Sequence, residues 1–258
     1  MHLIDTHTHL YLEHFDSDRD DMLQRAFSAG IHQLFLPNID MHSLQPMLEL
    51  CRNYPSNCFP MIGLHPTSVG ENVNEQLRFL EEAMAHSKFY AIGEIGIDLY
   101  WDKTFIDAQI TAFRTQLDWA KKLNLPVVIH TRDAFPLILD LVEEAQDGSL
   151  TGVFHCFTGD ETDAKRIMDM NFMMGIGGVV TYKKSHLPEV LQHVPLDFMV
   201  LETDSPYLPP VPYRGKRNES SYMIETAQKL AEIKDVSLEE IAMMTTRNAQ
   251  KLFKISSL

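Results

Sequence analysis

The chain contains eight short apolar runs, and amphipathic segments with helical periodicity separate most of them. Most of these runs are nearly continuous in apolar residues, which is typical of parallel strands that are buried on both faces. Eight strands that alternate with helices predict an α/β protein, a (β/α)8 TIM barrel. We predict the strands at residues 3–6, 33–36, 59–63, 90–93, 126–129, 152–154, 172–176 and 198–201.

Helices are predicted where apolar residues recur every three or four positions. The last predicted helix begins with Ser237-x-x-Glu240, a capping-box pattern. An open, doubly wound sheet is the alternative fold, but no Gly-x-Gly-x-x-Gly pattern follows the first strand. Gly93 and Gly96 are instead interpreted as a tight turn at a strand end. The predicted helices cover residues 17–29, 105–123, 136–145, 162–170, 187–193, 220–233 and 237–253.

The length of 258 residues suits a single α/β barrel, so we predict one domain that spans residues 1–258. No apolar run approaches the roughly 20 residues of a membrane span, and no signal-peptide pattern is recognised. The three cysteines include no Cys-x-x-Cys pair, which fits a reducing compartment. We therefore expect a cytoplasmic protein without membrane association, and we interpret Cys156 as a core thiol.

The formal net charge of −14 argues against broad, non-specific binding to nucleic acid, which depends on neutralising phosphates. It does not exclude a phosphate-containing substrate, because bound metal ions and a few local cations can reverse the field inside a pocket. No heptad pattern or exposed apolar stripe indicates an obligate protein partner.

Side chains that can bind metal ions follow several predicted strands. Residues two apart in a strand point to the same side, so His7 and His9 would direct both imidazoles to one point. Active sites of such barrels lie at the carboxyl ends of the strands, so groups that follow other strands are expected to join them. The whole set is His7, His9, Glu94, His130, His155 and Asp204.

Six such groups exceed the needs of one tetrahedral zinc ion, and a carboxylate can bridge two ions with its two oxygens. We therefore predict two sites that share Glu94. The two histidines of the first strand and Asp204 complete one site, and His130 and His155 complete the other. Two ions about 3.5–4 Å apart can clamp the attacking and leaving oxygens of a displacement. Glu94 and Asp204 are the predicted catalytic residues, and Asp204 would orient a water molecule or accept its proton.

Each of these groups also has a structural interpretation. The two histidines of the first strand could be ordinary polar residues at a strand end. Glu94 could cap a helix or form an ion pair, and Asp204 could start a turn.

Four further residues are predicted to contact the substrate. His65 either touches the substrate or supports the loop before Pro66. Arg132 follows His130 by two positions, so it would face the same pocket. Arg214 and Arg217 belong to a cationic segment after the eighth strand and could bind phosphate oxygens bidentately. The alternative for that segment is a solvated basic loop.

Several longer motifs surround these residues. They are Asp5-Thr6-His7-x-His9-Leu10, Gly63-x-His65-Pro66, Gly93-Glu94-Ile95-Gly96-x-Asp98, His130-x-Arg132, His155-Cys156-Phe157 and Glu202-Thr203-Asp204-Ser205-Pro206-Tyr207-Leu208. In these motifs the chain resembles the TatD family of metal-dependent hydrolases, from its first strand to about Asn218. The resemblance implies an amidohydrolase-like barrel with a deoxyribonuclease activity, in some members a 3′-to-5′ exonuclease, and metal binding by the six groups named above. Glu94 stands where related barrels carry a carboxylated lysine.

Three functions follow as hypotheses. The first is a phosphodiesterase that cleaves DNA or RNA ends and contacts only a few terminal nucleotides. The second keeps the metals but acts on an ester or amide, because similar proteins include deacylases of D-aminoacyl-tRNA. The third is a non-catalytic metal-binding barrel. Two divalent ions are expected, zinc, manganese or magnesium, although four imidazoles suit magnesium least.

Overall fold

The computed structural model describes residues 1–256, and eight β-strands lie within that range. Each predicted apolar run contributes to one strand, so the number and the order of the strands are as predicted. The domain boundary predicted at residue 258 lies outside the described residues. The strands are β1 Leu3–Asp5, β2 Ile31–Pro37, β3 Cys58–Met61, β4 Ile92–Asp98, β5 Val127–Arg132, β6 Gly152–Phe154, β7 Met173–Ile176 and β8 Met199–Leu201.

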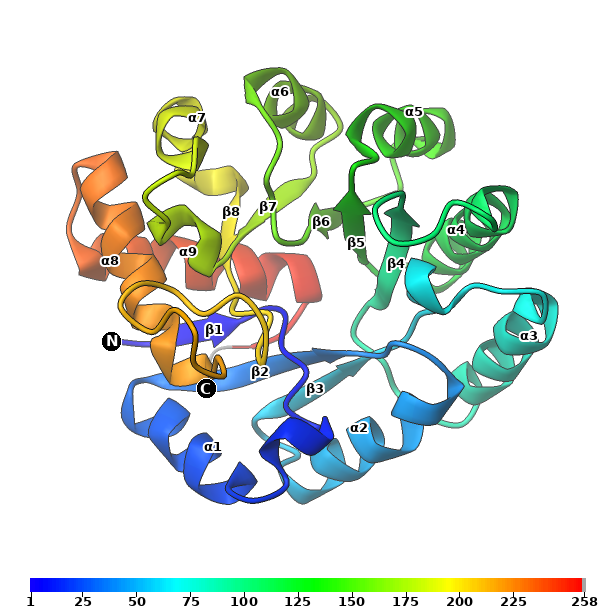
Figure 1. Ribbon diagram of the computed structural model, residues 1–258, viewed down its shortest axis with the longest axis horizontal. Coiled ribbons are helices and arrows are strands. Elements are labelled where there is room, and N and C mark those ends of the chain that lie inside the picture. The colour runs from blue at the N-terminus through cyan, green and yellow to red at the C-terminus, as the bar shows by residue number, and fades with distance from the viewer. Residues whose placement is uncertain (257–258) are drawn as a thin grey trace.

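The strands form a closed, parallel barrel (Figure 1). β1, β2 and β3 pair in this order, and β4 to β8 pair in a second sheet. A parallel bridge between Ile62 and Ile92 joins the two sheets on one side. On the other side the amide of Thr6 donates a hydrogen bond to the carbonyl oxygen of Leu201, at 3.0 Å. The predicted (β/α)8 barrel is therefore confirmed.

Most helices surround the ring of strands, and α9 lies behind it in the view of Figure 1. No helix was expected where α2 and α3 lie. α2 begins with a capping box made by Asp40 and Ser43, and it contains Pro46, which obscures the helical pattern. Among residues 1–256, no helix combines the length and the apolar character that a membrane span requires. The helices are α1 Arg19–Ser28, α2 Met41–Asn53, α3 Val73–Met84, α4 Ile106–Leu123, α5 Phe135–Ala145, α6 Glu161–Asp169, α7 Leu187–His193, α8 Met223–Lys234 and α9 Leu238–Phe253.

The inside of the barrel is filled by inward-facing strand residues and by the end of α9. Ile4, Phe35 and Val200 belong to this inner core, together with Phe253 of α9. The ring of Phe253 stacks on that of Phe35, with 3.9 Å between the centroids. α9 also bonds to the chain just before β1, because Thr246 Oγ1 donates to the carbonyl oxygen of His2 at 2.9 Å. The helix thus covers the amino-terminal ends of the strands, and their carboxyl ends stay open for a site.

β4 is longer than predicted, and the expected strand-end turn at Gly93 and Gly96 is wrong. The strand continues to Asp98, and Gly96 pairs with His130 of β5. Gly96 has a φ of +152°, and a Cβ at this position would overlap the carbonyl oxygen of His130. Glycine is therefore required here for the close approach of two strands. Glu94 consequently lies within β4, at an irregularity in the pairing with β5, and its amide donates to the carbonyl oxygen of Asn38 at 3.2 Å.

Candidate metal centre

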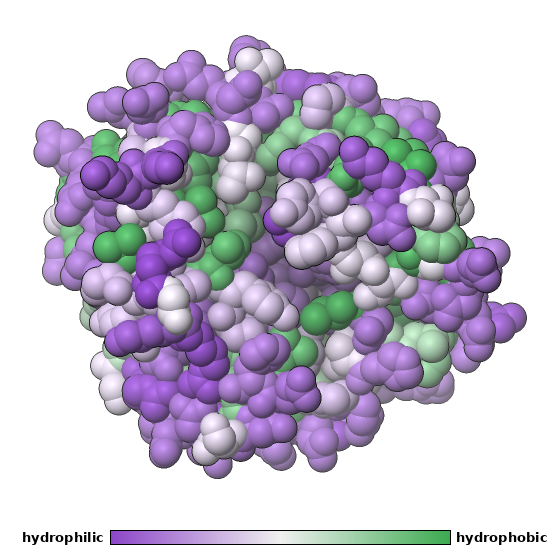
Figure 2. Space-filling model, viewed as in Figure 1, coloured by the Kyte–Doolittle hydropathy of each residue, from purple (hydrophilic) through white to green (hydrophobic). Residues whose placement is uncertain are grey.

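The six predicted metal ligands gather around one cavity at the carboxyl ends of the strands. The cavity has a volume of about 610 Å³, and five of the six line it. His7 is the sixth, and it is completely buried beside the others. The face shown in Figure 2 is hollowed near its centre, above the ring of strands. The fold of the barrel therefore brings these six metal-binding side chains, which come from several strand ends, together in one site.

Glu94 lies at the centre of this group, and each of its carboxylate oxygens faces a different pair of imidazoles. Oε2 lies 3.1 Å from Nε2 of His7 and 3.5 Å from Nε2 of His9. Oε1 lies 3.0 Å from Nδ1 of His130 and 3.1 Å from Nε2 of His155. This geometry places the carboxylate between the two histidine pairs.

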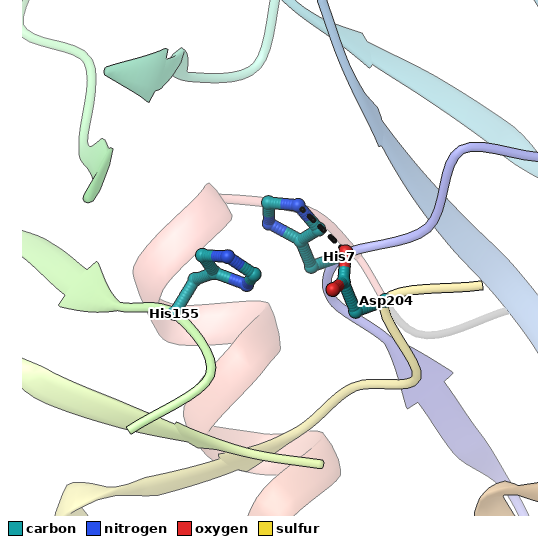
Figure 3. A group of neighbouring side chains, drawn as sticks. All are labelled: His7, His155 and Asp204. Atoms are coloured by element: carbon teal, nitrogen blue, oxygen red, sulfur yellow. Dashed lines mark ion pairs between the residues drawn. The ribbon is translucent and has the colours of Figure 1, made fainter. Parts of the chain in front are cut away.

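Asp204 adds a carboxylate on the side of His7 and His9. Its Oδ1 lies 3.7 Å from Nε2 of His7 and 3.5 Å from Nε2 of His9. Asp204 has a φ of +55°, and its amide donates to the carbonyl oxygen of His7 at 2.9 Å, which holds the loop after β8 against β1. Figure 3 shows Asp204 and His155 close to His7, whose ring stacks on that of His155 with 3.7 Å between the centroids.

The donors fit divalent transition-metal ions. Nε2 of His7 and Nε2 of His9 are 3.3 Å apart, so both imidazoles are directed at the same place. Nδ1 of His7 is buried and has no hydrogen-bond partner within residues 1–256. Nitrogen and carboxylate donors together suit zinc, manganese or iron. Three groups have ligand atoms within 4.8 Å of one another: His7, His9 and Glu94; His7, His155 and Asp204; and His65, Glu94 and His130.

The third group gives His65 a position that the sequence analysis did not propose. Its Nε2 lies 3.3 Å from Oε1 of Glu94, and its Nδ1 lies 2.7 Å from the hydroxyl of Thr67. His65 also lines the cavity, as the predicted substrate contact requires. Its placement therefore makes it a candidate ligand in addition to a candidate substrate contact.

Burial and neighbouring charges together set the ionisation of the centre. Burial alone would raise the pKa of Glu94, but the surrounding imidazoles, led by that of His65, hold it well below its usual range. Burial also opposes a charge on Asp204, whose pKa is lowered by the hydrogen bond from His9. Burial would lower the pKa of His9, but its bonds to Asp204 and Glu94 raise it to about 9. The carboxylates stay ionised, and protons on the imidazoles balance charges that a divalent cation would neutralise instead.

Two buried carboxylates behind the ligands were not predicted as site residues. Oε1 of Glu202 lies 3.2 Å from Nδ1 of His155, and Oδ2 of Asp98 lies 2.9 Å from Nε2 of His130. Carboxylates in such positions fix the ring orientation of a ligating histidine. Side-chain alternation along β4 places Asp98 on the same face as Glu94, so the sequence carried a signal for it. Glu202 likewise stands two positions before Asp204, so the same spacing carried a signal for it, although its partner His155 follows a different strand.

The interpretation of Cys156 as a core thiol is wrong. The residue is partly exposed and lines the cavity. β6 ends at Phe154, and Cys156 has a φ of +46°, so the alternation of an extended strand no longer applies there. The thiol therefore belongs to the wall of the cavity.

The three predicted substrate-binding arginines occupy different places. Arg132 lines the cavity, and within residues 1–256 no other arginine or lysine does so. The guanidinium of Arg214 lies over the ring of Tyr182, 3.9 Å from its centroid. Arg217 donates to both carboxylate oxygens of Asp18, at 2.6 and 2.8 Å. The structure thus places neither Arg214 nor Arg217 in the lining of the cavity. The guanidinium of Arg214 packs on a tyrosine ring, and that of Arg217 is held by Asp18.

Comparison with known proteins agrees with this geometry. The family model described as TatD related DNase matches residues 4–254. The chain is 39% identical to the metal-dependent hydrolase YabD of Bacillus subtilis, over 98% of this chain and 100% of YabD. It is 33% identical to the metal-dependent hydrolase YcfH of Escherichia coli, over 100% of this chain and 97% of YcfH. The crystal structure of YjjV, a TatD homologue from Escherichia coli, matches with a TM-score of 0.92 and 29% identity over 98% of both chains. The chain belongs to the family of TatD-related DNases and is a metal-dependent hydrolase on a TIM barrel.

Proposed function

We propose that the protein uses two divalent cations to hydrolyse phosphodiester bonds at the ends of DNA or RNA strands. The observation that carries the proposal is the position of Glu94, whose two oxygens face separate pairs of imidazoles. A carboxylate placed in this way can be shared by the two cations of such a centre. The description of the matching family as DNases supports a nucleic-acid substrate. Zinc, manganese and magnesium are the proposed cations.

The residues divide into two sets of ligands around Glu94. One cation would be held by His7, His9, Asp204 and Oε2. The other would be held by Oε1 with His130 and His155. When bound, divalent cations polarise a phosphoryl oxygen and lower the pKa of a water molecule. Glu94 itself is a poor proton acceptor here, because both of its oxygens are already engaged.

Asp204 is the proposed proton acceptor. It lines the cavity, and 15% of its side chain is exposed, so a water molecule can reach it. Burial would favour the neutral acid, but His9 and the other imidazoles lower the pKa of Asp204, and the carboxylate is ionised at neutral pH. An ionised carboxylate at this position would accept a proton from the attacking water as the new bond to phosphorus forms and the P–O bond to the leaving nucleotide breaks. The leaving oxygen would take up a proton from solvent, so water is consumed and one phosphodiester is cleaved.

The charge distribution limits the contact with nucleic acid to a short stretch. The chain carries a formal net charge of −14, and Arg132 is the one arginine or lysine of residues 1–256 that lines the cavity. Such a protein gains little from neutralising a long run of phosphates. A substrate end that enters the cavity needs only a few phosphate contacts.

The proposal is tested with end-labelled single-stranded DNA, duplex DNA and RNA, each with Mg²⁺, Mn²⁺ or Zn²⁺. We expect release of terminal nucleotides that stops when the cation is chelated. Asp204→Asn should slow this release by about 100-fold or more, because proton transfer by a positioned group contributes roughly 10²–10⁴. Asp197→Asn is the matched control, since Asp197 is exposed and pairs with Arg247 at 3.5 Å, away from the cavity lining.

Cleavage that survives chelation, or that Asp204→Asn leaves unchanged, contradicts the proposal. D-Aminoacyl-tRNA is included as a further substrate. Release of a free amino acid with intact tRNA, without release of nucleotides, would assign the centre to a carboxylic ester instead.

A further inference from the structure

Two adjacent aromatic side chains stand exposed at the rim of the cavity. Tyr100 is 53% exposed and Trp101 is 68% exposed, in the loop that follows β4. Their rings are perpendicular, at 89°, with 4.9 Å between the centroids. Trp101 also lines the cavity that contains the metal centre. Large aromatic rings are seldom left in water without a reason, and these two lie beside the reactive groups.

The guanidinium of Arg132 packs on both rings. Its central carbon lies 3.7 Å from the centroid of Tyr100 and 5.3 Å from that of Trp101. Within residues 1–256 this guanidinium makes no ion pair or hydrogen bond, whereas that of Arg217 is held by Asp18. Stacking fixes the plane of Arg132 and leaves its N–H groups free for a ligand with acceptor oxygens.

Asp98 connects this aromatic cluster to the metal centre. Its Oδ1 accepts hydrogen bonds from the amides of Tyr100, at 3.0 Å, and Trp101, at 3.2 Å. Its Oδ2 lies 2.9 Å from Nε2 of His130. One buried carboxylate therefore positions both the loop and a candidate metal ligand, so the rings keep a defined distance from the reacting centre.

We propose that Tyr100, Trp101 and Arg132 form a stacking subsite for an unpaired base near the end of the nucleic-acid strand. This inference rests on the proposed nuclease function and names the part of the substrate that the rim recognises. A base would stack on the exposed face of Trp101, and Arg132 would contact the adjoining phosphate. An apolar peptide would gain nothing from the free guanidinium, whereas a nucleotide offers both a π-face and an anion.

The subsite has a consequence for substrate choice. A base can lie on Trp101 only when it is not stacked within a duplex, so single-stranded or frayed ends should be preferred. Every base has a π-face, so the preference should depend little on sequence.

The kinetic test compares Trp101→Ala with Trp101→Phe, which retains a ring. Phe79→Ala is the matched control, because Phe79 is an aromatic residue, 42% exposed, on α3. The substrates are a single-stranded oligonucleotide and the same strand with abasic terminal nucleotides. For the normal strand we expect Trp101→Ala to raise KM about tenfold, within the range of base–aromatic stacking, with little change in kcat. Trp101→Phe and Phe79→Ala should resemble the wild type.

The abasic strand separates the two contacts. Wild type and Trp101→Ala should have equal KM values on it, because no base is present to stack. Arg132→Gln should raise KM on both strands, because the phosphates remain. Equal KM values for wild type and Trp101→Ala on the normal strand overturn the subsite.

A binding measurement makes this failure distinguishable from failure of the proposed function. The chain has two tryptophans, and Trp119 is only 3% exposed, so added DNA should quench chiefly Trp101. We expect quenching by single-stranded DNA in Asp204→Asn and its loss in Asp204→Asn with Trp101→Phe. Quenching without cleavage by the wild type supports the subsite and refutes the nuclease. Cleavage that does not depend on Trp101 refutes the subsite and supports the nuclease function. If neither quenching nor cleavage is observed, both proposals are refuted.

Discussion

The carboxylate of Glu202 lies against Gly175, so closely that a Cβ at position 175 would overlap its Oε2. Its Oε1 lies 3.2 Å from Nδ1 of His155, and Nε2 of the same imidazole lies 3.1 Å from Oε1 of Glu94. A glycine in β7 thus gives room to a carboxylate that orients a histidine toward the centre. The arrangement links a residue without a side chain to the position of a metal ligand.

We expect Glu202→Gln to lower metal affinity by about 10- to 100-fold, the usual cost of losing a carboxylate behind a ligating histidine. The amide retains the size of the side chain but loses the charge that favours a proton on Nδ1 of His155. Competition with a chromophoric chelator measures the affinity. Glu189→Gln, an exposed position on α7, is the control. Equal metal affinities in Glu202→Gln and Glu189→Gln would show that Glu202 does not position His155. Gly175→Ala should lower the metal affinity as Glu202→Gln does, because the added methyl group would displace the carboxylate of Glu202.

Glu94→Gln should remove both cations at once. Each oxygen of Glu94 faces a different imidazole pair, so neither set of ligands is complete without its charge. His9→Ala, in contrast, should lose one cation and retain the other. Elemental analysis of the purified, metal-loaded variants counts the ions, and circular dichroism verifies that each variant is folded. One ion retained by Glu94→Gln would show that the carboxylate is not shared.

Removal of the metal should lower the thermal stability of the protein. A ligand present at 100 times its Kd stabilises the folded state by about 2.7 kcal/mol. For a chain of this size the stabilisation corresponds to a Tm higher by roughly 5–10 °C. Thermal melts with a chelator and with each cation in excess measure the shift. Glu94→Gln should have the same Tm with the chelator and with excess cation. A wild-type Tm that does not change when the chelator is added would contradict metal binding at this site.

Asp18 should contribute stability that depends on pH. The hydrogen bonds from Arg217, chiefly, and from Arg25 lower the pKa of Asp18 to about 2. In the unfolded chain this pKa is about 3.9. The folded state therefore favours the ionised form of Asp18. The resulting stabilisation is complete above about pH 4.5, declines as the pH falls below the unfolded pKa, and is lost as the pH falls through about 2.

The corresponding experiment compares the Tm of wild type and Asp18→Asn between pH 7 and pH 3. The variant should melt at a lower temperature at pH 7, and the difference should persist to about pH 4.5 and shrink below it. Asp118→Asn, at an exposed position on α4, controls for the loss of one surface charge. A Tm difference that grows as the pH falls would show that the sign is wrong.

The sequence was sufficient for the order of the strands, because their buried faces demand apolar residues at each of the eight positions. It was insufficient at β4, where Gly93 and Gly96 looked like a turn. The need for Gly96 comes from the carbonyl of His130 on the neighbouring strand, and no local pattern contains that information.

The candidate site, like the fold, could be predicted only in part from the sequence. Donors at the carboxyl ends of strands converge in any such barrel, so the positions of His7, Glu94 and Asp204 could be inferred from strand order alone. The partner of Arg217 could not, since Asp18 is 199 residues away in the chain. A contact between two loops depends on how the neighbouring helices pack, and local sequence patterns do not contain that information.

The stacking of Phe253 on Phe35 also bears on how the protein is made. A ribosome synthesises all eight strands before α9 emerges, so the inner apolar faces near β1 and β2 stay uncovered until then. The nascent chain therefore remains vulnerable to aggregation through most of its synthesis. Chaperones that bind exposed apolar strands have their longest opportunity on the half of the barrel that is made first.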